Sequence, residues 1–246
     1  FFADVTHLGR TRSEIESLKA ANEKLRSSLI NRKNADAELE QLKSVLDLAG
    51  TAQYKVVSAK VISLGSTSSF TQTISIDAGV NMGVRQNMTV ISGLGLVGVV
   101  KISYPNHALV QLTTDPAFRV GARVAGSQQI GILSGQGTNK AVLQLLDNQT
   151  ALKVGDVILA RGSQNNRPFV PGVPIGSVTS VDNAAGAITQ TADVKLYPNF
   201  STLSLVAVVV GAPKTDPRDA LVPKAPAPTP VPTVTIYATP SESSTP

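Results

Sequence analysis

Three residues in the middle of the chain could form a hydrolytic relay, because a histidine, an aspartate and a serine follow one another. They are His107, Asp115 and Ser134, and the serine lies in the string Gly-Ile-Leu-Ser-Gly. A serine nucleophile needs a histidine base and a carboxylate that orients it, and this chain order is that of chymotrypsin-like proteases. Those proteases place base and nucleophile on different barrels, whereas these three residues fall within 28 positions. We therefore expect no catalytic residue and keep a serine hydrolase as an alternative hypothesis.

Other kinds of catalytic or ligand site have little support in the composition. The chain has no Cys and two His, which excludes thiolate metal sites and leaves few ligands for a histidine-built one. The string G-x-G-x-x-G at 93–98 is predicted to join two strands, whereas a phosphate-binding loop of this kind must open a helix. Few aromatic residues and scattered Lys and Arg argue against nucleic-acid binding. We expect no cofactor, no metal and no nucleic-acid partner.

Residues 1–50 are predicted to form a long helix with a leucine-rich seam. The stretch has no Gly or Pro between Thr11 and Ala49, and Gly50 follows as a stop signal. Four of the five heptad d positions are Leu, and Asn22 at an a position favours a two-stranded partner in register. We expect homodimerisation through this seam, and a single amphipathic helix lying on the rest of the chain is the alternative. The expected seam residues are Ile15, Leu18, Asn22, Leu25, Leu29, Leu39 and Leu46.

From residue 51 to 211 the pattern changes to short Val- and Ile-rich segments separated by Gly, Asn, Asp or Pro, which predicts an all-β body. The number of segments exceeds the need of one small barrel. We expect two barrels, over 51–115 and 116–211, with the strands near 194–210 left open to either one. The segments are 54–64, 71–77, 88–92, 96–103, 108–113, 129–134, 141–146, 156–160, 175–181, 187–195 and 203–210.

A faint internal repeat supports the division into two units. Residues 84–100 and 152–178 each contain a turn, a strand, a Gly-containing loop and a second strand. Asn87 takes the place that Gly155 has in the second copy, and Asn tolerates a left-handed turn better than other non-Gly residues. The segment 212–246 holds nine of the fifteen Pro residues and is predicted to be a disordered tail. The expected structural turns are at Gly79, Gly83, Asn87, Gly93, Gly98, Gly155, Gly172 and Gly176.

In its ordered series of short motifs, the β body resembles the family of rod shape-determining proteins called MreC. No single string is diagnostic, but their order over about 150 residues is specific. Asn87 departs from the Gly that the family usually has, and Ala-Arg-Gly at 160–162 replaces the usual Thr-Ser-Gly. The matching stretches are 77–79, 83–84, Met88, 95–100, 112–118, 131–135, 153–157, 171–176, 193–194 and 200–203.

This resemblance implies two six-stranded barrels in a chymotrypsin-like arrangement without its active site. It also implies a single-pass protein of the cytoplasmic membrane, with an anchor before Phe1 and this region on the outer side. Its implied partners are the MreB filament, MreD, the RodA polymerase and a class B penicillin-binding transpeptidase, which the family helps to activate. We expect a non-enzymatic scaffold of peptidoglycan synthesis. A periplasmic adaptor of an efflux or secretion system is a further alternative, although such adaptors usually have two antiparallel helical arms.

Overall fold

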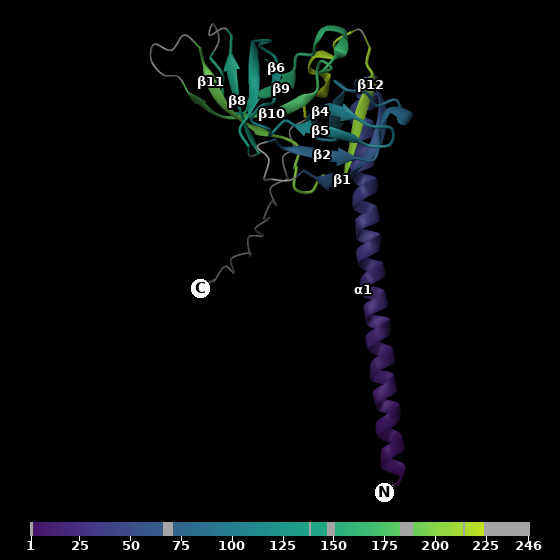
Figure 1. Ribbon diagram of the computed structural model, residues 1–246. Coiled ribbons are helices and arrows are strands. Elements are labelled where there is room, and N and C mark those ends of the chain that lie inside the picture. Colours follow the sequence, from purple (N-terminus) through teal and green to yellow (C-terminus); the bar gives the residue numbers. More distant parts are fainter. Residues whose placement is uncertain are drawn as a thin grey trace, which may run out of the picture.

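The computed structural model describes residues 2–65, 71–137, 139–146, 151–182, 189–213 and 215–223, with side chains from residue 15 onward. One long helix, α1 (Phe2–Thr51), leads into a body of two closed six-stranded antiparallel barrels (Figure 1). The predicted class, mainly β with an N-terminal helix, is confirmed. At about 1.5 Å per residue the helix is about 75 Å long, and most of it stands clear of the body (Figure 1).

Strands from both ends of the β body close the first barrel. The strand order is β1-β12-β3-β4-β5-β2, so the last strand returns to pair with β1 and β3. Of the residues near 194–210 that the sequence left open, β11 remains in the second barrel and β12 belongs to the first. The strands of the first barrel are β1 (Lys55–Leu64), β2 (Thr73–Ile76), β3 (Thr89–Ser92), β4 (Gly95–Ser103), β5 (Ala108–Leu112) and β12 (Leu205–Gly211).

The second barrel has the strand order β10-β11-β8-β7-β6-β9 and is continuous in sequence. Its strands are β6 (Arg119–Val124), β7 (Ile130–Gly135), β8 (Lys140–Leu145), β9 (Val157–Ala160), β10 (Pro174–Asp182) and β11 (Thr191–Leu196). Three short 3-10 turns complete the described elements: η1 (Val80–Met82), η2 (Gln164–Asn166) and η3 (Arg218–Leu221).

Strand β6 is the described strand that lies outside the predicted segments. Its sequence, Arg-Val-Gly-Ala-Arg-Val, contains a glycine and two charges, which weaken the local preference for a strand. The strand forms because Val120, Ala122 and Val124 alternate into the core of the second barrel, where all three are buried.

Two apolar cores hold the body together. One fills the first barrel. The other fills the second barrel and extends into the junction between the barrels, where residues of β3, β4 and β12 join it. Val45 and Ala49 of α1, and Ala52 directly after it, also belong to this second core. The end of the helix is therefore packed into the same interior that joins the barrels.

The helix does not stop at Gly50 as the sequence predicted. It continues to Thr51, and the left-handed residue that ends it is Gln53, with φ of 57°. The N–H of Tyr54 then donates to the carbonyl of Ala49 over 2.8 Å, which satisfies one of the last helical carbonyls. Gly50 lies within the last turn.

The residues expected at turns fall into two groups. Asn87 and Gly155 have φ of 60° and 96°, the left-handed region. Gly83 and Gly172 also have positive φ. Gly79, Gly93, Gly98 and Gly176 have no positive φ: Gly93 lies in the turn between β3 and β4, Gly79 directly precedes η1, and Gly98 and Gly176 lie within β4 and β10. These four glycines instead allow close approach, because a Cβ on each would lie 1.9–2.2 Å from a neighbouring atom.

Candidate protein-interaction site

Asp115, the carboxylate of the predicted relay, is committed to backbone structure. It is fully buried after β5, where the chain crosses to the second barrel. One carboxylate oxygen accepts the N–H of Ala117 at 2.7 Å and the side-chain amide of Gln111 at 3.1 Å. The other oxygen accepts the N–H of Gln72 at 2.6 Å. This carboxylate therefore secures the crossing between barrels by satisfying buried N–H groups.

The other two residues of the relay lie elsewhere. The ring of His107 stacks on Tyr104 with centroids 4.5 Å apart, next to the turn that leads into β5. Ser134 lies on β7 of the second barrel, opposite Arg119 on β6. In the part of the chain that the structure describes, none of the three side chains hydrogen-bonds to another. The arrangement supplies no base for the serine.

The G-x-G-x-x-G string also has a structural explanation. It lies in the β3–β4 hairpin, where no described helix follows it. A Cβ on Gly93 would lie 2.0 Å from the Ser44 hydroxyl of α1, and one on Gly95 would lie 2.2 Å from the carbonyl of Pro174. The glycines thus let the hairpin press against the helix on one side and the second barrel on the other.

One face of the last turns of α1 is fastened to the first barrel. Glu38 forms an ion pair with Lys60 of β1 at 2.8 Å. The hydrogen bond and charge of Glu38 raise the pKa of Lys60. The side-chain oxygen of Gln41 accepts the Ser204 hydroxyl at 2.8 Å and the N–H of Leu205 at 3.1 Å. Both contacts tie the helix to the strands that meet where the first barrel closes.

The leucine-rich seam points away from this fastened face. Successive helical residues turn by about 100°, so Leu46 and Leu39 point about 100–120° away from Val45, and Leu18 and Leu25 about 160° or more. Val45 is 1% exposed, whereas the adjacent Leu46 is 48% exposed and Leu39, six residues before Val45, is 52% exposed. The body therefore packs on one face and leaves the seam open along its whole described length.

All of the predicted seam residues are exposed: Ile15, Leu18, Asn22, Leu25, Leu29, Leu39 and Leu46. A row of apolar side chains repeating at heptad spacing is the surface that a second helix covers in a coiled coil. Because the alternative of a single helix lying on the body would bury this row, the observed packing does not match it. We regard the seam as the candidate interaction site.

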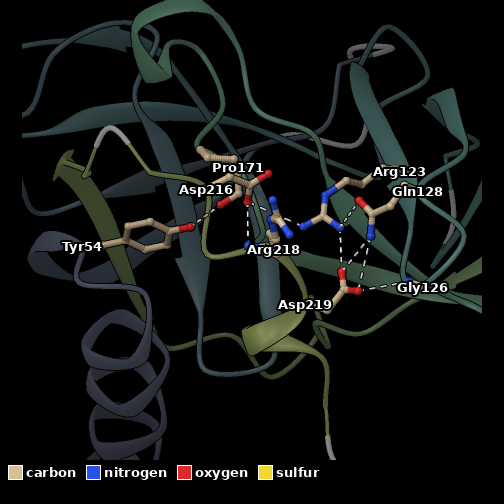
Figure 2. A network of polar contacts seen from close by, with 8 residues as sticks. All are labelled: Tyr54, Arg123, Gly126, Gln128, Pro171, Asp216, Arg218 and Asp219. Atoms are coloured by element: carbon tan, nitrogen blue, oxygen red, sulfur yellow. Dashed lines mark hydrogen bonds and ion pairs between the residues drawn. The ribbon is translucent and has the colours of Figure 1, made fainter.

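A second set of polar contacts fixes the helix end and the two barrels at their junction (Figure 2). The hydroxyl of Tyr54, the residue before β1, donates to the carbonyl of Pro171 in the second barrel. Burial, and next the charge of Asp216, raise the pKa of Tyr54, while Arg123 opposes them. The hydroxyl of Thr89 on β3 donates to the carbonyl of Pro168 at 2.8 Å.

Sequence reasoning missed these junction residues. Thr89 resembles any other strand threonine, and nothing local marks it. Arg123 lies in the one strand that was not predicted, and its side chain is 5% exposed. A charged residue between apolar ones in a Val- and Ala-rich stretch is the signal that could have identified it, because a buried arginine needs partners.

Neither a membrane-spanning helix nor a cluster of metal ligands is found in the described part of the chain. No helix among those residues has both the length and the apolar character to cross a membrane. Nor do the described His, Asp and Glu residues gather in a group of three or more that could hold a metal ion.

Comparisons with known proteins agree on one family. The family model "Rod shape-determining protein MreC, barrel core" matches residues 61–210. The Cell shape-determining protein MreC of Streptococcus pneumoniae is 28% identical over 213 residues, covering 84% of this chain and 78% of the relative. A solved structure named MreC has a TM-score of 0.63 at 25% identity, covering 71% of this chain and 98% of its own.

A further solved structure shares the fold at lower identity. It is a complex between Penicillin-Binding Protein (PBP2) and MreC from Helicobacter pylori. Its matching chain has a TM-score of 0.51 and 16% identity, and the match covers 63% of the present chain and 99% of that one.

Proposed function

The chain belongs to the MreC family of rod shape-determining proteins, and on that premise we propose that it is a dimeric, non-enzymatic scaffold that positions and activates peptidoglycan synthases. The observation that supports this most directly is the free seam on a helix whose end is packed into the body. A pair of such helices would present two barrel bodies in a defined arrangement.

The proposed mechanism is positional. The end of α1 joins the core that links the two barrels, so pairing of the helices would fix the direction of the barrels as well. A bound enzyme would then be held at a set distance and orientation. Catalysis by the chain itself is not part of the proposal, because both carboxylate oxygens of Asp115 are occupied by N–H groups.

The partner that we propose first is a class B penicillin-binding transpeptidase, since the related fold from Helicobacter pylori is described in complex with PBP2. The RodA polymerase, MreD and the MreB filament are proposed from the family resemblance. We also propose from it that this region lies on the outer side of the cytoplasmic membrane. The adaptor alternative is disfavoured, because the described residues after α1 add only short 3-10 turns and provide no second helical arm.

The test is a binding and activation assay with the transpeptidase and RodA of the same bacterium. We expect the full chain to bind the transpeptidase and to increase glycan polymerisation by the RodA complex. A monomeric seam variant should bind the isolated transpeptidase but activate the complex less. A chain that is dimeric yet binds neither enzyme would refute the proposed function.

A further inference from the structure

Residues 215–223, which we call the clasp, pack on the body although the sequence predicted a disordered tail over the whole of 212–246. The expectation is wrong for this segment. It contains η3, and its Leu221 is buried in the junction core together with Val45 and Ala49 of α1. The remaining tail, 224–246, lies outside the described residues. A Pro-rich composition alone did not reveal that the first part has both an apolar and a charged anchor.

The charged anchor is a buried arginine of the second barrel. The guanidinium of Arg123 on β6 donates to the Asp219 carboxylate at 2.6 Å and lies 3.6 Å from that of Asp216 (Figure 2). The second carboxylate oxygen of Asp219 accepts the N–H of Gly126 at 3.1 Å. The hydrogen bond from Arg123 is the main cause that lowers the pKa of Asp219.

Arg123 has no other carboxylate partner among the described residues. Its one further bond is to the side chain of Gln128 at 3.0 Å, and its Nε and Nη2 atoms have no hydrogen bond. Departure of the clasp would thus remove both carboxylates that balance the guanidinium, whose side chain is 5% exposed with the clasp in place. Removing the counter-charges of such a group is unfavourable.

The clasp also touches the helix. Of the described elements, α1 has its main contacts with β1, β3 and β12 of the first barrel and with η3. Tyr54, three residues after the helix ends, donates from its hydroxyl to the carbonyl of Pro171 in the second barrel. An open groove of about 380 Å³ separates Leu48 of α1 from Pro174 of the second barrel, and Leu221 lines it. The clasp therefore bridges the helix and the second barrel beside a gap.

We propose that the clasp is a built-in strap that locks the orientation of α1 relative to the second barrel. Asp219 anchors it to Arg123, and Leu221 anchors it to the junction core beneath the helix. The proposal concerns geometry within one chain and does not depend on the proposed function.

The test uses the full chain, which has no Cys, so spin labels can be placed freely. One label pair joins Glu40→Cys on α1 to Gln144→Cys on the second barrel, both exposed. Excess unlabelled chain suppresses distances between molecules. A second pair, Gln144→Cys and Lys153→Cys, reports on the second barrel alone.

The perturbing variant is Asp219→Ala with Leu221→Ala. We expect the helix-to-barrel distance distribution to broaden about twofold and amide exchange at Gly126 to accelerate about tenfold or more, while the pair within the barrel is unchanged. The matched control, Asp182→Ala with Leu146→Ala, makes the same chemical changes at exposed positions of the second barrel. It should leave both distances as they are.

Two outcomes would overturn the proposal. The first is an unchanged width of the helix-to-barrel distance distribution despite faster amide exchange at Gly126, because release of the clasp would then not change the orientation of α1. The second is unchanged exchange, because Asp219 and Leu221 would then not be anchors. If the first variant unfolds the barrel, Arg123→Met with Asp219→Ala replaces it, since that pair of changes leaves no buried charge unpaired.

Discussion

Truncation of the seam by Leu25→Ala and Leu29→Ala should convert a dimer into a monomer. The two leucines are 63% and 59% exposed in the single chain, so more than half of each side chain is available to a partner helix. Complete burial of a leucine contributes about 1.5–3 kcal/mol, and the available part that alanine lacks is worth about 1 kcal/mol per site. Two sites in each of two chains give about 4 kcal/mol per dimer, which raises the dissociation constant about 1,000-fold.

Alanine is the appropriate replacement because it has the highest helix propensity, so the helix itself should persist. Ile30→Ala is the matched control. Ile30 is equally exposed, at 58%, but occupies heptad position b, one residue beyond Leu29 and off the seam. We expect this control to dimerise as the parent chain does.

Sedimentation velocity over a concentration series measures the dissociation constant, and circular dichroism checks the helix. The reasoning would be refuted if the double variant and the parent chain had the same dissociation constant. It would equally fail if Ile30→Ala weakened the dimer as much as the double variant does, because the interface would then not follow the heptad seam.

Three further changes test the packing and electrostatics of the body. Gly93→Ala should destabilise the fold by about 1–3 kcal/mol, because its Cβ would lie 2.0 Å from an α1 side chain; Gly50→Ala, which meets nothing within 4 Å, should raise the thermal midpoint instead. Asp115→Ala should lower the free energy of unfolding, measured in urea, by about 2–4 kcal/mol, since it leaves buried N–H groups without an acceptor. Ser134→Ala should change this free energy little, and a loss as large as that of Asp115→Ala would contradict the structural role given to Asp115. Burial is the main cause that raises the pKa of Tyr54, so the folded chain holds the phenolic proton more tightly than the unfolded chain does. The resulting contribution to the free energy of unfolding is complete below about pH 10 and is lost as the pH rises above it. Tyr54→Phe should therefore lose less stability than the parent chain between about pH 10 and 11. If the free energy of unfolding falls equally steeply with pH in both chains, the phenol is not buried as described.

Local patterns in the sequence determined the helix, its seam and most of the strands. Heptad spacing of Leu25 and Leu29 is a property of a few neighbouring turns, and burial in a barrel imposes alternation on each strand separately. The repeat that pairs Asn87 with Gly155 was visible for the same reason, because a left-handed turn restricts the residue at one position. These features depend on residues close together in the chain.

Only the tertiary structure decided which residues far apart in the sequence contact one another. Arg123 meets Asp219 across 96 positions, and Asp115 accepts the N–H of Gln72 across 43. Gly93 is needed because α1 lies against it, and the seam is free because the opposite helical face is fastened to β1 and β12. Such roles arise from the partner that folding brings near: the residues around Arg123 can indicate that it is buried, but they do not identify the distant carboxylate that pairs with it.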